Sequence, residues 1–208
     1  RKKYDTEYLG VSYFGHFARN EQGKAVAFHG AIPYVVTYQG KTELAAQYGD
    51  AMTLSDYTGR GFFTLLGQRT DEALKLAGIS FVYGFPNQNS EYGYLNKLDW
   101  EYKHRINRYK ISINTFPIEA ICRRSHWFKM KYAQWAAKKL NRIKSLAPVL
   151  PSSATDEGRL STRRDEAYFG YKSFTNNLIC DFQGNLVWLK LDSGILVGDI
   201  ALRNPDEF

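Results

Sequence analysis

The sequence predicts an α/β protein with a mixed central sheet flanked by helices, then a basic helical linker and a partial second α/β unit. Three observations support this class. Short strand-like runs precede a helical pattern at residues 61–77. An apolar run at 79–85 follows, and a strand reached through a helix is expected to lie parallel to the strand before it. Prolines and serines near residue 150 then separate a second group of strand-like runs.

The first elements form an antiparallel meander, because turn residues separate the strand-like runs. The turns are Asn20–Lys24 and Gln39-Gly40. The strands expected around them cover residues 13–18, 25–32, 34–38 and 42–53.

Helix and strand then alternate along the rest of the first half. The helix at 61–77 has apolar residues at helical spacing and is followed by Gly78, which is typical of a helix C-terminus. After the run at 79–85 we expect a short helix at 90–97 capped by Ser90, and a final strand at 108–113.

The second half begins with a basic amphipathic segment at 118–146, and its strands are expected at 171–180, 185–191 and 194–202. We therefore divide the chain into a first domain at 1–115, a helical segment and linker at 116–160, and a partial strand unit at 161–208.

Composition limits the classes of partner and site that we expect for this chain. The net charge of +7 favours anionic partners, which include coenzyme phosphates, nucleic acid and an anionic membrane face. The two cysteines and four histidines show no ligand spacing, so we expect neither a metal site nor a disulfide framework. No window resembles a membrane span or a signal peptide, and we expect a cytoplasmic protein.

The most informative segment runs from Asp56 to Leu66, where a glycine pair ends an extended stretch and a helix begins at once. Gly59 and Gly61 can adopt positive φ, which leaves the first-turn amides of the helix pointing at an open site. These amides, the helix dipole and the Arg60 guanidinium together favour a pyrophosphate. A tight turn without a ligand is the ordinary alternative for a glycine pair at this position.

Over residues 8–113 the sequence resembles the GNAT superfamily of acyl-coenzyme A N-acyltransferases. The resemblance rests on four segments: Gly49–Thr53, Tyr57–Phe63, Tyr83–Asn87 and Asn96–Trp100. It implies a GNAT-like fold with acetyl-coenzyme A as cosubstrate and a small amine as acceptor. The oligomeric state stays open.

The resemblance also implies roles for particular residues. Met52 and Thr53 would face the pantetheine arm, and Asn87 would face the same site. The residues that would hold the phosphates are Thr58, Gly59, Arg60, Gly61, Phe62 and Phe63.

Catalytic groups are less well marked, because the chain departs from the family pattern. Asp56 and Asp99 replace the usual Gln or Arg and the usual Gly, and Leu95 stands where a general-acid Tyr is common. The neighbouring Tyr94 is therefore either the acid that protonates the thiolate or a packing residue. For the base we consider Asp50 first and His29 second, although a turn-capping Asp and a core His are the ordinary alternatives.

These observations predict an N-acyltransferase that moves an acetyl group from acyl-coenzyme A to a primary amine. The first candidate acceptor is an amino sugar of envelope or polysaccharide synthesis, and a protein amine or a polyamine is next. Two alternatives stay open. The tail at 163–202 resembles the first half of another such unit, and tandem units are similar to Fem-type aminoacyltransferases, which use charged transfer RNA. The departures from the family pattern also allow an inactive, GNAT-shaped binding module.

Overall fold

The structure is a computed structural model that describes residues 2–107, 109, 111, 118–142, 149–156, 159–175, 177–191 and 195–202. The chain divides into two compact units, residues 1–107 and 108–208. None of the described helices has the length and apolarity that a helix needs to cross a bilayer.

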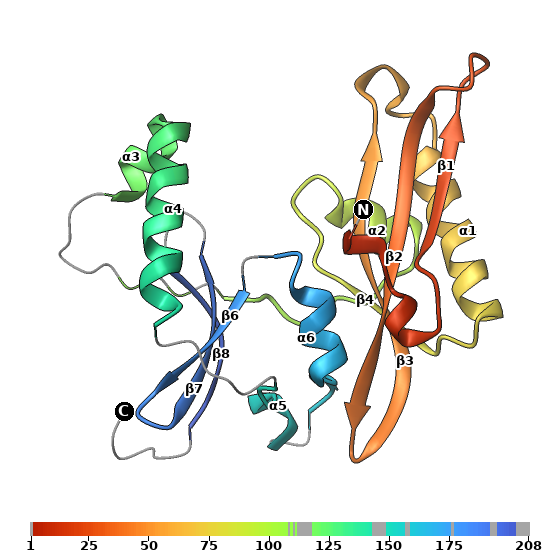
Figure 1. Ribbon diagram of the computed structural model, residues 1–208. Helices are drawn as coiled ribbons and strands as arrows, with labels where there is room; N and C mark the ends of the chain where they lie inside the picture. The colour runs from red at the N-terminus through yellow and green to blue at the C-terminus, as the bar shows by residue number, and fades with distance from the viewer. Residues whose placement is uncertain are drawn as a thin grey trace. The chain divides into compact units, whose positions relative to one another are not determined.

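The first unit is built on a mixed sheet whose strands follow the order β1-β2-β3-β4 (Figure 1). The strands are β1 (Phe14–Arg19), β2 (Ala25–Tyr38), β3 (Lys41–Thr53) and β4 (Phe81–Gly84). Strand β2 pairs antiparallel with both β1 and β3, whereas β4 lies parallel to β3. The meander and the parallel strand predicted from the sequence are confirmed.

Turn chemistry places these strands. Gly23 adopts a φ of 76° in the β1–β2 turn, which the Asn20 side chain closes by accepting from the Lys24 amide at 2.9 Å. Gln39 and Gly40 both adopt positive φ, as a two-residue hairpin requires. The runs expected at 25–32 and 34–38 form one strand, β2. Proline has no amide hydrogen to donate to a neighbouring strand, and Pro33 lies beyond Ala31, where the pairing of β2 with β1 ends.

Two helices complete the first unit, and α1 packs along β1, β2 and β3 (Figure 1). Helix α1 spans Phe62–Leu76, and α2 spans Glu91–Lys97. Short 3₁₀ turns occur at Lys2–Tyr4 (η1), Glu7–Leu9 (η2) and Ser55–Tyr57 (η3).

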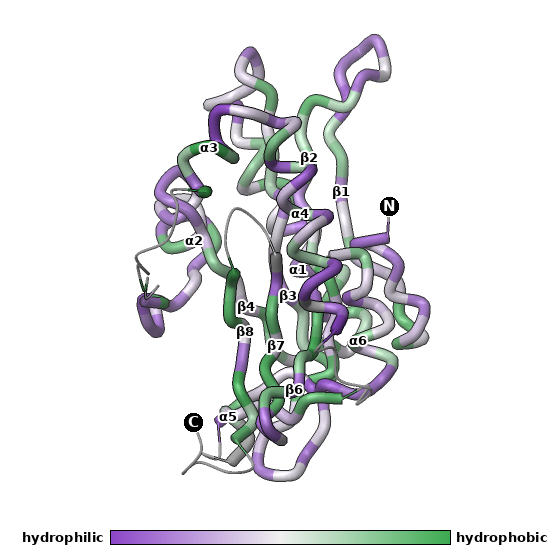
Figure 2. Tube along the Cα trace, turned by 60° about the vertical axis from the view of Figure 1, so that its left-hand side comes forward, coloured by the Kyte–Doolittle hydropathy of each residue, from purple (hydrophilic) through white to green (hydrophobic). Residues whose placement is uncertain are grey.

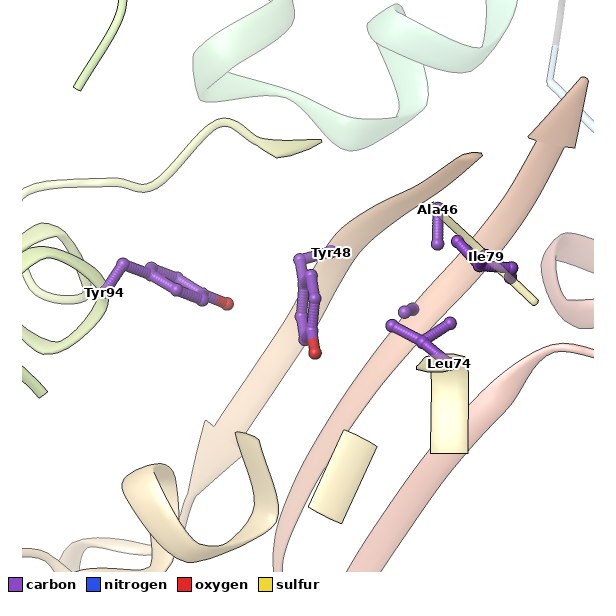
Figure 3. Packing of buried hydrophobic residues seen from close by; sticks show 6 residues of the cluster. Ala46, Tyr48, Leu74, Ile79 and Tyr94 are labelled. Atoms are coloured by element: carbon purple, nitrogen blue, oxygen red, sulfur yellow. The ribbon is translucent and has the colours of Figure 1, made fainter. Parts of the chain in front are cut away.

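Under α1 lies the main hydrophobic core of this unit, shown in Figure 3. Its buried residues come from β2, β3, α1, α2 and the start of the run that leads to β4: Ala31, Ala46, Tyr48, Leu74, Ile79 and Tyr94.

Helices α1 and α2 approach each other closely because two glycines leave room. A Cβ on Gly67 of α1 would meet Leu98 at 2.7 Å, and one on Gly93 of α2 would meet the Phe63 ring at 2.5 Å. This close packing fixes α2 against the first turn of α1.

The second unit contains helices and a three-stranded antiparallel sheet in the order β6-β7-β8. Its helices are α3 (Ile118–Arg124), α4 (His126–Leu140), α5 (Ser153–Asp156) and α6 (Glu166–Lys172). Its strands are β5 (Ser161–Thr162), β6 (Asn177–Phe182), β7 (Asn185–Leu191) and β8 (Ile195–Ala201). Figure 2 shows apolar residues along the strands of this unit.

Two expectations for the elements need correction, and a third is not tested. The helix expected at 118–146 is broken at Ser125, whose backbone is extended. The Ser125 hydroxyl oxygen accepts from the Phe128 amide and so caps α4. The strand expected at 171–180 is wrong over its first part, because Asp165 caps α6 and the strand begins only at Asn177. The strand expected at 108–113 and the helix end at 143–146 lie largely outside the described residues.

Candidate active site

The candidate site begins where β3 and β4 stop pairing. The last parallel pair joins Tyr48 to Gly84, but β3 continues to Thr53 alongside β2. Opposite His29, β3 carries two residues, Asp50 and Ala51, so the strand bulges there. Among the described strands, none pairs with the β4-facing edge of residues 49–53. An extended ligand could add to this edge through backbone hydrogen bonds.

The glycine loop follows directly after η3. Gly59 and Gly61 have φ of 74° and 78°, and a Cβ on either would meet nothing within 4 Å. Gly61 is the N-cap of α1, and no side chain caps the helix. The first-turn amides of a 15-residue helix therefore end at open space without a capping acceptor, an arrangement that suits an anion.

Arg60 and Thr58 hold the shape of this loop. The Arg60 guanidinium donates to the Asp56 carbonyl at 3.0 Å and lies over the Tyr57 ring, 4.7 Å from its centroid. The Thr58 hydroxyl donates to the Ser55 carbonyl at 2.7 Å. Arg60 is exposed, so its charge remains at the loop surface while these contacts restrain it.

The two phenylalanines differ. Phe63 points inward, and its ring lies 5.4 Å from His29 and 5.0 Å from Tyr94. Phe62 is half-buried near Tyr57. Any contact of Phe63 with a phosphate at the helix end would therefore use its backbone amide.

Met52 and Thr53 lie on the last residues of β3, before the loop. Met52 is paired with Phe28 of β2 and is exposed, and Thr53 is paired with Ala27. The end of β3, expected to contact the pantetheine arm, and the glycine loop, expected to bind the phosphates, therefore follow one another closely along the chain.

Asn87 organises the start of α2. Its Oδ1 accepts from the amides of Asn89 and Ser90 at 3.0 and 3.1 Å. Ser90 is the N-cap residue, but its side chain makes no capping bond, so the expected Ser90 cap is replaced by this Asn87 turn. Within the described part of the chain, Asn87 Nδ2 makes no hydrogen bond, which leaves a donor for a ligand.

Asp50 lies in the β3 bulge with a φ of 61°. Its Oδ2 accepts from Lys3 Nζ and from the Tyr4 hydroxyl. Partial burial alone would raise the pKa of Asp50, but the bonds from Lys3 and Tyr4 outweigh it and lower this pKa below its ordinary value. Such a carboxylate stays ionised near neutral pH, which makes it a better anchor for a cation than a proton acceptor.

His29 and Tyr94 meet in the core. The Tyr94 hydroxyl lies 3.3 Å from His29 Nε2, and the two side chains come from β2 and α2. Burial, followed by the nearby His16, lowers the pKa of His29 to about 4. Burial, followed by the charge of Asp71, raises the pKa of Tyr94 to about 12. The pair is therefore neutral at physiological pH.

Tyr94 is 5% exposed and is packed among aromatic rings, with Trp100 at 4.6 Å and its ring directed toward Tyr48 (Figure 3). His29 is 1% exposed, and its Nδ1 has no hydrogen-bond partner among the described residues. This orphaned nitrogen is the one unsatisfied feature of the pair.

Sequence reasoning named His29 and Tyr94 separately and did not anticipate that they touch. It also missed Lys3 and Tyr4 as partners of Asp50. Tyr4 further contacts Tyr13 and Phe28, with ring centroids at 4.9 and 6.2 Å. No pattern near residue 4 points to residue 50, so only the fold could reveal these contacts. Among the described residues, no group of three or more metal-ligating side chains converges.

Structural comparison finds acetyltransferases at low identity. The Trypanosoma brucei acetyltransferase is 15% identical with a TM-score of 0.43, covering 50% of this chain and 73% of that one. The glucosamine-6-phosphate N-acetyltransferase from Arabidopsis thaliana is 13% identical with a TM-score of 0.41, covering 47% and 66%. An aminoglycoside 6'-N-acetyltransferase from Acinetobacter haemolyticus is 13% identical with a TM-score of 0.40, covering 52% and 77%. No curated protein matches the sequence.

The family comparison is confined to the first unit. Residues 7–103 match the family model of the acetyltransferase (GNAT) domain. The interpretation of residues 161–208 as part of a second similar unit stays a prediction, because the match ends before them. The matched segment contains the bulged end of β3, the glycine loop, α1 and α2. Residues 7–103 thus form a domain similar to those of the GNAT acetyltransferase family.

Proposed function

We propose that this protein is an N-acyltransferase that moves an acetyl group from acetyl-coenzyme A to a primary amine. The observation that carries the proposal is the open helix end at Gly59–Gly61, which follows the bulged strand β3 and the turn η3. The edge of β3 at residues 49–53 is unpaired among the described strands. The family match over residues 7–103 supports it.

The glycine loop would hold the pyrophosphate. Backbone amides at the start of α1 would donate to the phosphate oxygens, and Arg60 would add a charge-assisted contact. The absence of a Cβ at Gly59 and Gly61 fits this use, because the space above both residues is open.

The end of β3 would hold the acyl arm. Backbone groups at Met52 and Thr53 would pair with the amide groups of pantetheine as a neighbouring strand does, and Asn87 Nδ2 would donate from the opposite side. An amide that donates to the thioester carbonyl would also stabilise the oxyanion formed when the amine attacks.

The acceptor would lie beside Asp50. Asp50 Oδ1, which accepts no hydrogen bond within the described part of the chain, would bind the ammonium, and a water molecule would take its proton before attack. The Tyr4 hydroxyl donates to this carboxylate, and the Tyr4 ring in turn contacts the rings of Tyr13 and Phe28. Aromatic rings stack against the apolar faces of sugars. These contacts support an amino sugar as the acceptor.

The amine nitrogen forms a bond to the acetyl carbon, the carbon–sulfur bond breaks, and the thiolate takes a proton from solvent. Tyr94 is buried and bonded to His29, so we assign this pair a positioning role: it holds Phe63, and with it the first turn of α1.

The burial of Tyr94 favours a second candidate, a module that binds acyl-coenzyme A without turnover. The two candidates share the coenzyme site and differ only in transfer. Under the first, thiol release from acetyl-coenzyme A rises when an acceptor amine is added. Under the second, binding occurs without release.

A thermal-shift titration with acetyl-coenzyme A is the first test. At 100 times its dissociation constant a ligand adds about 2.7 kcal/mol of stability, which is a shift of several degrees. Glucosamine and spermidine are then compared as acceptors in the thiol-release assay, and glucosamine is expected to react. No shift with acetyl-coenzyme A, together with a shift with charged transfer RNA, would exclude this function and favour the Fem-type alternative.

A further inference from the structure

The positive charge of this protein is concentrated in one segment. Residues 118–142 contain seven lysines and arginines and a single acidic residue, Glu119, whereas the whole chain has a net charge of +7. The segment forms α3 and α4 of the second unit, in which α4 contacts α3 and β7. A surface with this charge attracts anionic partners.

One face of α4 is both basic and apolar. Helical spacing of three and four residues places its exposed residues together, and purple and pale residues follow one another along α4 in Figure 2. We call this the Trp–Lys face; its residues are Trp127, Met130, Lys131, Gln134, Trp135 and Lys138. The other face, which includes Phe128, Tyr132 and Ala136, is buried or half-buried.

The apolar members of the face are large and open to solvent. Trp127, Trp135 and Met130 are 69%, 57% and 50% exposed. The two indoles are eight residues apart, or about 12 Å along the helix, and Lys131 lies between them. An exposed apolar patch that is rimmed by polar residues is typical of an interaction surface.

We propose that the Trp–Lys face of α4 binds the surface of an anionic lipid bilayer. Tryptophan rings favour the boundary between headgroups and acyl chains, where the indole N–H reaches water and the ring reaches hydrocarbon. Lysine ammonium groups pair with lipid phosphates while their alkyl stems lie along apolar surface. The helix lies flat on the bilayer, because its opposite face packs within the second unit.

Met130 distinguishes this partner from single-stranded nucleic acid. Bases stack on tryptophan, and phosphates pair with lysine, so those residues suit both partners. An exposed thioether chain between the two tryptophans in sequence offers no stacking surface, but it inserts readily among acyl chains. The observations therefore favour lipid.

The test is co-sedimentation of the whole chain with vesicles of phosphatidylcholine alone or of phosphatidylcholine and phosphatidylglycerol in equal parts. We expect binding to the mixed vesicles, with a blue shift of tryptophan emission, and little binding to phosphatidylcholine. Equal binding to both vesicles, or to neither, would overturn the proposal.

Matched variants distinguish an effect of the Trp–Lys face from an effect of the net charge of the chain. Lys131→Glu with Lys138→Glu is expected to lower partitioning by about tenfold or more, since each basic residue near an anionic surface contributes substantially. Lys24→Glu with Lys41→Glu makes the same change in net charge at two exposed hairpin turns and is expected to have much less effect.

Removal of the indoles gives a second check. Trp127→Ala with Trp135→Ala should abolish the blue shift and weaken vesicle binding, whereas Leu76→Ala removes an apolar side chain that is 90% exposed elsewhere and should do neither. Tighter binding to a single-stranded RNA probe than to mixed vesicles, lost in the tryptophan variant, would replace lipid by nucleic acid as the partner. Neither outcome depends on acetyl-coenzyme A.

Discussion

At the scale of single residues, burial of His29 makes stability depend on pH. The pKa of His29 is lowered from 6.5 to about 4, so below pH 6.5 the unfolded chain takes up a proton that the folded chain rejects. The free energy of unfolding is therefore unaffected by this residue above pH 6.5, and it decreases as the pH falls from 6.5 toward 4. Urea unfolding at pH 7 and pH 5 should differ by about 2 kcal/mol from this residue.

His29→Gln is the control for this prediction, because Gln can still bond to the Tyr94 hydroxyl and does not titrate. The variant should lose less stability than the parent between pH 7 and pH 5. Asp50 does not affect this comparison. Its pKa is lowered from 3.8 in the folded protein, so the stability that it contributes is lost only as the pH falls below 3.8. An equal loss in both proteins would show that another group titrates in this window.

The glycine loop gives the second prediction at this scale. Gly61→Val places a branched side chain in the open space at the helix end, and acetyl-coenzyme A binding should disappear. Gly10→Val is the matched control, because Gly10 also has positive φ and open space around it. Both variants should lose about 1–2 kcal/mol to backbone strain, but only the loop variant should lose the ligand. Titration calorimetry with acetyl-coenzyme A measures ligand binding by each variant.

Arg60 is expected to act differently from Gly61. Arg60→Ala removes a charge-assisted contact of about 1.5–3 kcal/mol, so the coenzyme dissociation constant should rise about tenfold or more. Arg69→Ala, which removes an exposed charge farther along α1, should leave binding within about threefold. If Arg60→Ala and Gly61→Val both bind acetyl-coenzyme A like the parent, the glycine loop is only a turn and the proposed function fails.

Residue chemistry in the sequence predicted the conformation of the glycine loop, but not the surroundings of the candidate catalytic residues. Glycines before a helix indicate an anion site from local geometry alone. The environment of Tyr94 depends on His29, which lies 65 positions earlier, and that of Asp50 depends on Lys3 and Tyr4. No local pattern encodes such contacts, so their effect on the two pKa values emerges only from the fold.

At the scale of elements, the packing of α2 on α1 depends on Gly93. A Cβ there would lie 2.5 Å from the Phe63 ring, which is itself packed against His29 and Tyr94. Gly93→Ala should therefore lower stability by about 1–3 kcal/mol, because overpacking outweighs the gain in helix propensity. It should also weaken coenzyme binding by moving the first turn of α1.

Gly170→Ala is the matched substitution in α6, where a Cβ would meet nothing within 4 Å. It should leave the unfolding temperature unchanged or raise it, since alanine favours a helix by up to about 1 kcal/mol over glycine. If both variants raise the unfolding temperature, the Phe63 ring moves freely and the close packing of α1 and α2 does not constrain the site.

Element prediction succeeded where local signals were strong. The Gln39-Gly40 turn and the apolar spacing of α1 encode their own structure. The run at 171–180 misled because its aromatic residues suit a strand, while the Asp165 cap just before it starts a helix. Similarly, Ser125 lies inside a continuous helical pattern, but its cap hydrogen bond to Phe128 begins a new helix.

At the scale of the whole molecule, the two units differ in charge. Residues 1–107 contain twelve basic and eleven acidic residues, so the second unit carries nearly all of the net charge of +7. Coenzyme binding in the first unit must then rely on local amides and Arg60 rather than on the field of the whole chain. Vesicle binding by α4 relies on that field.

Salt should therefore separate the two activities. Between about 0.1 M and 1 M NaCl the Debye length falls from about 10 to 3 Å, which screens exposed lysines far more than amides in direct contact with phosphate. We expect partitioning onto anionic vesicles to fall by more than about tenfold, while the acetyl-coenzyme A dissociation constant rises only about threefold. Calorimetry and co-sedimentation on the same protein measure the two slopes. An equal decline would mean that the charge excess of the second unit also drives coenzyme binding, and the division of roles between the units would be wrong.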